Sequence, residues 1–598
     1  MKNHYTLCNK DPALNMLDFV RLLKRRYQNI LNHTRDREPL NSHGKDCLSS
    51  LCLSEAFLEK GDLLRRHPNL PFQFAVIGPT QAGKSSVVNL LLAQEYAGVS
   101  PLAGFTTFPR GFALGLKDSD RFAIENFFHD YRRINPTEDT KNPNGAFSFK
   151  QVSAEEHPHF RNCIIWDTPD FDSIHSANYY NSLLRTIALA DAILLVVSKD
   201  KYADQTVWNM LSLIEVLKQP TVIFLNKISP ENTPIVIQSF REKWRHSRTD
   251  PIPPIVAAPY FSEGIKPLNA GREYEQLIVH LEWAKSAVKR NQHRRNCAVL
   301  LNRHWANWTE AVRQEQNLSS EWKRLVDSAA SSTLEIYERS YLNHPRHFET
   351  LKQALAELLT LLEIPGIAPL LMKTRALLTW PIRRLFGLGK RQSVDSDNEM
   401  RKSREMQVLE RMFEHYIIHL SDAVFSKRGE FGEYEYWWNE ISSLLKLEYP
   451  ALLETYNQAV RTYQTDFLHE IEDAAHRLYS KLEQQPATLN SLRATRITTD
   501  AAALAIALKT GGIGVQDFVI TPAVLSLTSF LTESALGHYM KRVEAELKQN
   551  QLQAVSVRLF DVALNQHLKS LPARMNPNNK FNIPEDALRD AEAQLHEF

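Results

Sequence analysis

One stretch, Gly78 to Ser86, restricts the fold of this chain more than any other. Its sequence, Gly-Pro-Thr-Gln-Ala-Gly-Lys-Ser-Ser, matches the pattern G-x-x-x-x-G-K-[ST]. The apolar run from Phe74 to Ile77 precedes it, and a run of helical character from Val87 to Leu92 follows it. A loop of this pattern between a strand and a helix is the setting in which backbone N–H groups cradle phosphates. We therefore predict a phosphate-binding loop, or P-loop, in this stretch.

The residue types of the P-loop suit phosphate chemistry. Gly78 and Gly83 carry no side chain, so backbone N–H groups can face the phosphates, and the N-terminus of the following helix adds positive potential. We expect Lys84 to bridge the β- and γ-phosphates of a nucleotide and Ser85 to bind Mg²⁺. The predicted nucleotide-binding residues of the loop are Gly78, Pro79, Thr80, Gln81, Ala82, Gly83, Lys84, Ser85 and Ser86.

Two residues outside the P-loop are predicted to serve the metal ion. Asp167 follows the apolar run from Cys163 to Trp166, and a carboxylate at a strand end can reach Mg²⁺ through water. Thr107, with Thr106 in reserve, lies in a segment that would close over the γ-phosphate in the triphosphate state. The alternatives are ordinary polar turns at both places. The predicted catalytic set is Lys84, Thr107 and Asp167, and the predicted metal ligands are Ser85, Thr107 and Asp167.

A fourth element is predicted to bind the base. Asn226 and Lys227 stand at the end of the apolar run from Thr221 to Leu225, and Ser229 follows them. An Asn-Lys pair at a strand end can pack on a purine and hydrogen-bond to it. The alternative is a polar strand end without a ligand. Asn226, Lys227 and Ser229 complete the predicted nucleotide-binding residues.

The hydrophobic pattern predicts an α/β P-loop domain joined to a large all-α region. Near-continuous apolar runs suit strands of a parallel-rich sheet that helices cover on both faces. The polar stretch 117–161 is predicted to be an insertion beside the sheet. The predicted domains are an N-terminal helical segment at 1–70, the P-loop domain at 71–265, a helical stalk at 266–548 with apolar segments 364–389 and 500–540, and a C-terminal helical, polar tail at 549–598.

Composition restricts the cellular setting. The net charge of +2 excludes binding of polyanions by bulk charge, and five scattered cysteines favour a reducing compartment. The first residues lack the apolar run of a signal peptide, and no apolar run is long enough for a simple membrane-spanning helix. We expect a cytoplasmic protein, with a peripheral position on the cytoplasmic membrane left open.

Taken in chain order, the four elements resemble those of the translation-factor-like class of P-loop GTPases, in its Era-type and dynamin-type branches. The P-loop, Thr107, Asp167–Asp170 and Asn226–Ser229 stand where these families have the P-loop, the switch-one threonine, D-x-x-G and N-K-x-D. The resemblance covers residues 71–260. It implies binding and hydrolysis of GTP with Mg²⁺, and it leaves ATP as an alternative nucleotide.

Three residues depart from the family pattern. Asp170 replaces the D-x-x-G glycine, whose N–H faces the γ-phosphate, and a carboxylate there would repel that phosphate. Phe171 follows, so no glutamine is available there to orient water, and Arg110 or a partner would have to assist. Ser229 replaces the aspartate that reads guanine, and a hydroxyl accepts hydrogen bonds more weakly than a carboxylate. These departures favour slow hydrolysis and leave guanine preference open.

The helical region contains segments that could bind several kinds of partner. Residues 364–391 combine apolar residues and Trp380 with six cations and no acid, as in an interfacial membrane segment. The stretch from Ala501 to Tyr539 is largely uncharged. Both could equally be core helices of a bundle. A dynamin-like protein would use them to meet a membrane surface or another copy of itself. The alternatives are an Era-like ribosome- or RNA-associated GTPase, with Lys289–Arg303 on RNA, and a nucleotide-binding module with little turnover.

Overall fold

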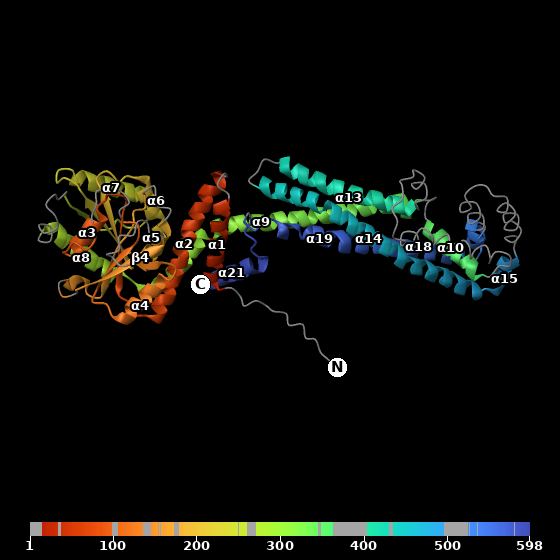
Figure 1. Cartoon of the computed structure of the whole chain (residues 1–598), viewed down its shortest axis with the longest axis horizontal. Helices are drawn as coiled ribbons and strands as arrows, with labels where there is room; N and C mark the ends of the chain where they lie inside the picture. The colour runs from red at the N-terminus through yellow and green to blue at the C-terminus, as the bar shows by residue number, and fades with distance from the viewer. Residues whose placement is uncertain are drawn as a thin grey trace, which may run out of the picture. The chain divides into compact units, whose positions relative to one another are not determined.

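The computed structural model describes residues 15–33, 38–98, 106–134, 145–153, 155, 157–172, 179–248, 250–259, 271–344, 349–362, 404–429, 434–494, 524–525, 527–534, 536–578 and 580–598. The chain forms two compact units (Figure 1). The first consists of Met1–Gln316 with Asn576–Phe598, and the second of Asn317–Met575. The boundaries at 70, 265 and 548 stay predictions.

The first unit contains a sheet and surrounding helices. Its strands are β1 (Phe72–Ile77), β2 (Arg110–Leu114), β3 (Arg132–Ile134), β4 (Ala146–Val152), β5 (Cys163–Asp167), β6 (Ala192–Ser198), β7 (Thr221–Asn226) and β8 (Ile255–Ala257). Its helices are α1 (Met16–His33), α2 (Glu38–Arg66), α3 (Lys84–Leu91), α4 (Asp118–Phe127), α5 (Tyr180–Leu189), α6 (Gln205–Ile214), α7 (Thr233–Ser247), α8 (Arg272–Ala287) and α21 (Glu585–Glu597). Helix α9 (His293–Tyr337) begins in this unit and ends in the second.

The described strands form one sheet of order β3-β4-β2-β5-β1-β6-β7-β8. Strands β5, β1, β6, β7 and β8 are parallel to one another, whereas β2 runs antiparallel to β5. Strands β1, β5 and β7 contain the apolar runs 74–77, 163–166 and 221–225, and β6 and β8 are apolar as well. The predicted α/β fold with a parallel-rich sheet is confirmed.

The expectation for residues 117–161 is partly wrong. The segment holds α4, β3 and β4, and β3 and β4 extend the sheet next to β2 instead of lying beside it. Along β4, Phe147 and Phe149 point to one face, and the Phe147 ring stacks on Phe128 at 4.8 Å between centroids. This period-two alternation is the strand signal that the polar character of the segment hides.

Both faces of the sheet are covered. Alternate strand residues point to opposite faces. One face, with Ala75, Ile77 and Trp166, packs into a core that includes α1, α2 and α5, and the other, with Phe74 and Val76, packs against α3 and α8. Because the five parallel strands are covered on both sides, their sequences are mainly apolar.

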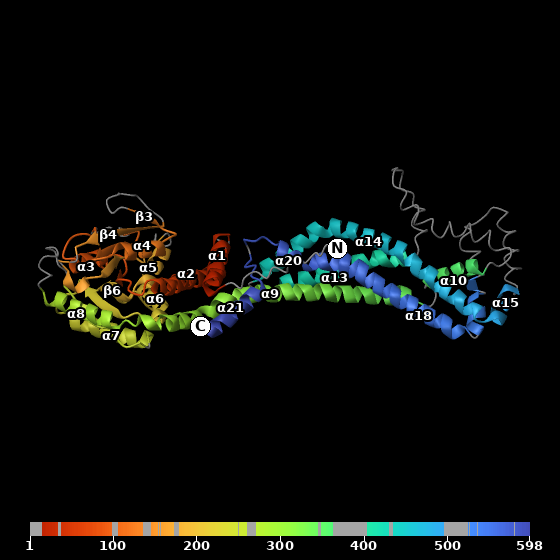
Figure 2. The ribbon, with the colours of Figure 1, turned by 90° about the horizontal axis from the view of Figure 1, so that it is seen from below.

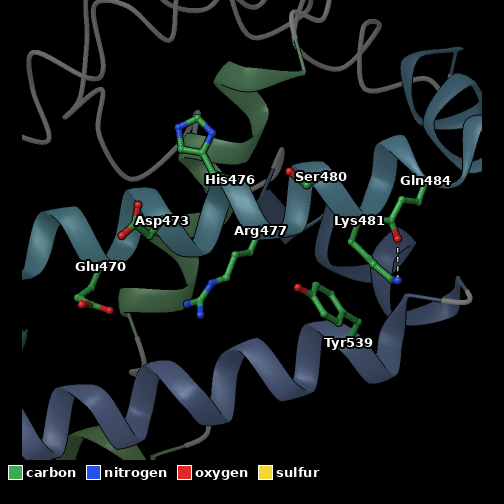
Figure 3. Close-up of a pocket in the computed structure, with 8 residues that line it drawn as sticks. All are labelled: Glu470, Asp473, His476, Arg477, Ser480, Lys481, Gln484 and Tyr539. Atoms are coloured by element: carbon green, nitrogen blue, oxygen red, sulfur yellow. Dashed lines mark hydrogen bonds between the residues drawn. The ribbon is translucent and has the colours of Figure 1, made fainter.

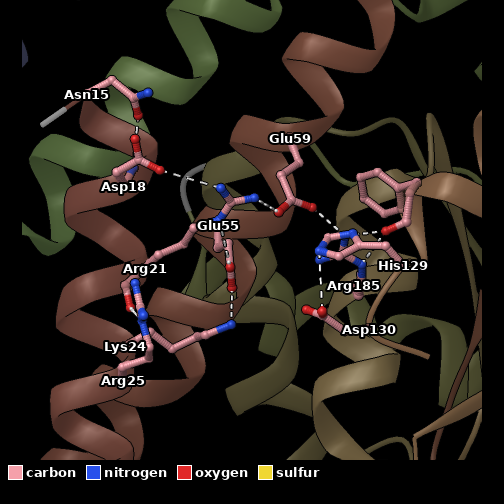
Figure 4. Close-up of polar contacts among 11 residues, drawn as sticks. Asn15, Asp18, Arg21, Lys24, Arg25, Glu55, Glu59, His129, Asp130 and Arg185 are labelled. Atoms are coloured by element: carbon pink, nitrogen blue, oxygen red, sulfur yellow. Dashed lines mark hydrogen bonds and ion pairs between the residues drawn. The ribbon is translucent and has the colours of Figure 1, made fainter.

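Charged side chains tie the N-terminal helices to α5 (Figure 4). Arg185 of α5 is buried, forms an ion pair with Glu59 of α2 and donates from Nε to the carbonyl oxygen of Phe127 at 2.7 Å. Glu59 also accepts from Arg21 of α1 at 2.7 Å. Buried charges are tolerated when they are paired in this way. The network therefore fixes how α1 and α2 pack on the sheet domain.

The second unit is helical. Besides the end of α9 it contains the π-helix η6 (Glu338–Leu342), α10 (Glu349–Leu361), α13 (Arg404–Gly429), α14 (Glu435–Glu483), α15 (Pro486–Ala494), α18 (Gly537–Ala554), the π-helix η9 (Val555–Asn565), α19 (Gln566–Lys569) and α20 (Leu571–Arg574). Figures 1 and 2 show α9, α13 and α14 side by side, and α18 contacts α14. The predicted large all-α region is confirmed.

The predicted apolar segments lie mostly outside the described residues. This holds for all of 364–389 and for most of 500–540, of which 524–525, 527–534 and 536–540 are described. Of the helices in the described part of the chain, none combines the length and the apolar character that crossing a bilayer requires.

A polar network lies in the core of the second unit. Glu405 Oε1 accepts hydrogen bonds from the hydroxyls of Tyr337 and Tyr463, each at 2.7 Å, and from Nε2 of Gln551 at 2.8 Å. The three donors come from α9, α14 and α18, and each is at most 1% exposed. Because a buried donor without an acceptor is costly, this carboxyl helps to fix the register of four helices.

The stability of the helical unit should depend on the protonation of Glu405. Burial raises the pKa of this carboxyl above its ordinary value of 4.5, although its hydrogen bonds oppose the shift. A raised pKa gives stability that is present below the ordinary pKa and lost as the pH rises through the folded-state value. Relative to Glu405→Gln, the wild type should therefore lose stability as the pH rises, in urea titrations followed by circular dichroism. A pH-independent difference would contradict this assignment.

Candidate functional site

The sheet topology brings the predicted site residues to one edge. The carboxyl ends of β1, β5, β6 and β7 coincide, since Val76 pairs with Asp167 and Ser198 pairs with Asn226. The P-loop follows β1 and leads into α3, which begins at Lys84. In open α/β sheets, ligands bind outside the carboxyl ends of the strands. This edge is therefore the candidate site.

The two P-loop glycines are required by close packing. A Cβ on Gly78 would lie 2.2 Å from the carbonyl oxygen of Val196 on β6. Gly83 has φ +93°, and a Cβ there would lie 2.3 Å from Nδ2 of Asn226. No real Cβ tolerates such distances, and the left-handed region disfavours any residue with a side chain. The loop therefore needs glycine at both positions to keep this shape.

Lys84 is held inside the loop. Its side chain is 5% exposed, and Nζ donates to the carbonyl oxygens of Gly78 at 3.0 Å and Pro79 at 3.2 Å. The same ammonium forms an ion pair with Asp170. The predicted lysine thus points into the curl of the P-loop, and the residue that departs from the family pattern contacts it directly.

Ser85 and Asp167 come together as predicted. The Ser85 hydroxyl donates to Oδ2 of Asp167 at 2.9 Å. Asp167 is fully buried, and its other oxygen, Oδ1, has no hydrogen-bond partner among the described residues. Burial raises the pKa of Asp167, and the charge of Lys84 opposes the shift. An unsatisfied carboxylate oxygen beside a hydroxyl suits Mg²⁺, which takes few protein ligands and completes its shell with phosphate and water.

Thr107 lies on the segment that enters β2. The first residue of β2, Arg110, pairs antiparallel with Asp167, so the segment before it lies at the same edge as the P-loop. Thr106 is buried and Thr107 is half-buried. The guanidinium of Arg110 lies over the ring of Phe108, 5.2 Å from its centroid. The roles of Thr107 as metal ligand and catalytic residue stay predictions.

Asn226 and Lys227 brace the P-loop. Asn226 Nδ2 donates to the carbonyl oxygen of Ala82 at 2.9 Å, and Lys227 Nζ donates to that of Gln81 at 2.8 Å. Ser229 is exposed, and its hydroxyl accepts from Nδ2 of Asn232 at 2.9 Å. Two of the three predicted base-binding residues therefore also hold the loop, a role that the sequence analysis did not assign. Base binding by all three stays a prediction.

Asp172 and Lys201 are contacts that sequence reasoning missed. Asp172 Oδ1 accepts from the backbone N–H of Thr80 at 2.6 Å and from its hydroxyl at 2.7 Å. Its other oxygen pairs with Lys201 at 3.0 Å. Burial opposes the ionisation of Asp172, but these hydrogen bonds prevail and lower its pKa. The one sequence signal for Asp172 was its position two residues after Asp170, and no motif marks Lys201.

A shallow groove in the second unit collects other polar residues (Figure 3). Its volume is about 440 Å³, and its lining comes from the last turns of α14, from Gln484 directly after that helix, and from Tyr539 of α18. Arg477 pairs with Glu546, and Lys481 donates to Gln484 at 2.8 Å. Its cations therefore contact side chains of the same unit, and no predicted site residue lines it.

Gly83→Ala should abolish phosphate binding because the added Cβ collides with Asn226 and the left-handed backbone becomes strained. We expect a loss of affinity for GTP of at least about 100-fold. Gly145→Ala is the matched control: Gly145 also has a positive φ, +69°, but nothing lies within 4 Å of an added Cβ. Titration with a fluorescent nucleotide measures both variants, and equal losses would contradict the packing argument.

Comparisons with known proteins agree with the geometry. Residues 73–227 match the family model described as 50S ribosome-binding GTPase. No curated protein matches the chain. Two solved chains of an oligomerised bacterial dynamin pair, described as sensing and tethering membranes over long range, align with 97% of this chain. Their TM-scores are 0.39 and 0.34, with 12% and 13% identity over 95% and 94% of their lengths. These scores are too low to support an argument. The P-loop, the metal-side pair and the family match together show that the chain carries a P-loop GTPase domain, the catalytic unit of GTP-hydrolysing enzymes.

Proposed function

We propose that this chain binds GTP with Mg²⁺ at the edge of its sheet and hydrolyses it as a molecular switch. The observation that carries the proposal is the convergence of Lys84, Ser85 and the unsatisfied oxygen of Asp167 at one strand edge. Lys84 would bind the β- and γ-phosphates, and Ser85 and Asp167 would hold Mg²⁺. A metal ion bound there neutralises charge on the phosphates.

Turnover without a partner should be slow. Phe171, which is 7% exposed, stands where a glutamine could orient water, and it packs into the core. Arg110 lies near the site because it stands opposite Asp167 in the antiparallel pair of strands β2 and β5. We propose that this arginine, or a group supplied by a partner, stabilises the charge that develops in the transition state.

The helical region is the proposed output of the switch. Helix α5 follows the loop that carries Asp170, and Arg185 on α5 pairs with Glu59 on α2. Trp305 and Trp308 of α9 pack in the same core as α2, and α9 continues as one helix into the second unit. A shift of the loop on nucleotide binding would therefore reach α9 through paired and packed side chains.

A membrane surface or a second copy of the chain is the proposed partner. The basic, acid-free segment 364–391 supports the former, because apolar residues and cations together suit an anionic lipid surface. The proposed location is accordingly the cytoplasm, with peripheral attachment to the cytoplasmic membrane. This arrangement is dynamin-like.

A ribosomal partner is the second candidate, and the description of the matching family favours it. The basic stretch 289–303 would be its contact. Within the first unit, however, Arg290 pairs with Asp191 at 2.5 Å, and Arg294 donates to the carbonyl oxygen of Glu597 at 3.3 Å. The guanidinium of Arg290 is therefore engaged within the unit, whereas Arg294 is exposed.

Lys84→Ala should remove nucleotide binding, because no other side chain of the P-loop carries a positive charge that could bind the phosphates. We expect wild-type protein to bind GTP more tightly than ATP and the variant to lose at least about 100-fold in GTP affinity. Calorimetric titration with each nucleotide in Mg²⁺ measures this. Equal affinity of the variant and the wild type would contradict the assignment of the site.

Ser229→Asp should sharpen the choice of base. A carboxylate accepts hydrogen bonds from the N1–H and N2–H groups of guanine more strongly than a hydroxyl does, and adenine has no N–H donor at these two positions. The ratio of GTP to ATP affinity should rise about tenfold or more. Ser229→Ala is the control and should not raise the ratio. An unchanged ratio in the aspartate variant would show that Ser229 does not face the base.

Liposome flotation and RNA-binding measurements distinguish the membrane from the ribosome as the partner. We expect the wild-type chain to float with anionic liposomes and its GTP turnover to rise with lipid. Replacing Arg383 and Arg384 by glutamate should abolish both effects, whereas Lys84→Ala should remove turnover alone. Salt-sensitive binding to ribosomal RNA without lipid binding would instead favour the ribosomal candidate.

A further inference from the structure

Two carboxylates of the loop after β5 contact the P-loop at different points. Asp170 forms an ion pair with Nζ of Lys84, and Asp172 accepts from the backbone and the hydroxyl of Thr80. Both are buried: Asp170 is 7% exposed, and the side chain of Asp172 is 5% exposed. Negative side chains thus fasten the loop to the P-loop twice.

The two contacts differ in their relation to a bound nucleotide. Lys84 is the cation that a P-loop offers to the β- and γ-phosphates, so Asp170 and a γ-phosphate need the same ammonium. Two anions that share one cation in a buried site repel each other strongly. The contacts of Asp172 are with Thr80 and Lys201 and do not involve Lys84. The first contact therefore opposes triphosphate, and the second does not.

We propose that Asp170 is a positioning residue that takes the place of the γ-phosphate on Lys84 and makes the site favour diphosphate over triphosphate. The inference rests on the proposed function. With a diphosphate, Lys84 can bridge the β-phosphate and Asp170. A triphosphate must break the buried ion pair and expel the carboxylate, while Asp172 keeps the loop attached to Thr80.

Asp170→Asn tests the proposal because it removes the charge and keeps the shape. Affinities of the full chain for GDP and for a non-hydrolysable GTP analogue are measured in Mg²⁺. We expect the affinity for the triphosphate to rise at least about tenfold, and that for GDP to change by less than about threefold. Asp200→Asn, which removes an exposed carboxylate in the turn after β6, is the control and should leave the ratio unchanged.

Thermal unfolding separates positioning from a structural role. Without nucleotide, Asp170→Asn should melt below the wild type, because Lys84 loses its ionic partner. With the triphosphate analogue, this deficit should shrink, because the wild type must give up the same ion pair when the analogue binds. A purely structural Asp170 would lower both melting temperatures by the same amount. If the asparagine variant does not fold, Asp170→Gly takes its place, with the same expected direction.

Two outcomes overturn the proposal, and they are distinguishable. A triphosphate-to-diphosphate ratio that stays constant or falls in a folded Asp170 variant, while the wild type binds GTP, contradicts this inference alone. Absence of any nucleotide binding by the wild type contradicts the proposed function as well.

Discussion

The backbone of the P-loop lies so close to the ends of β6 and β7 that only glycine fits at two of its positions. Gly78 faces the carbonyl oxygen of Val196, and Gly83 faces the amide of Asn226. Asn226 and Lys227 then hydrogen-bond to the loop carbonyls and hold it against the sheet. The shape of the loop, and with it the position of Lys84, follows from this packing.

The charges of the site obey the rule that buried charge must be paired or must bind a ligand. Lys84 pairs with Asp170, and Asp172 is satisfied by Thr80 and Lys201. Asp167 is the exception, since one of its oxygens has no partner among the described residues although the residue is fully buried. A carboxylate left in this state next to a serine hydroxyl is what a metal-binding position requires, so the electrostatics and the motif point to the same chemistry.

Local patterns predicted the parts of the structure that local physics determines. The five parallel strands were predictable because burial on both faces makes each of them mainly apolar, and Lys84 and Ser85 were predictable because the loop has a fixed spacing. Strands β3 and β4 were missed: Arg132 and Arg133 are exposed in β3, and β4 alternates between apolar and polar residues. Asp172 and Lys201 were missed because their contacts join distant segments: Asp172 follows Thr80 by 92 positions, and no spacing rule encodes such a pairing.

Hydrogen exchange on the full chain tests the central claim most directly. With Mg²⁺ and a non-hydrolysable GTP analogue, the account predicts slower exchange in residues 78–86, where backbone N–H groups meet the phosphates. It also predicts altered exchange in residues 167–172, where the analogue displaces Asp170 from Lys84. Unchanged exchange in both segments at saturating nucleotide, or protection confined to other parts of the chain, would contradict it.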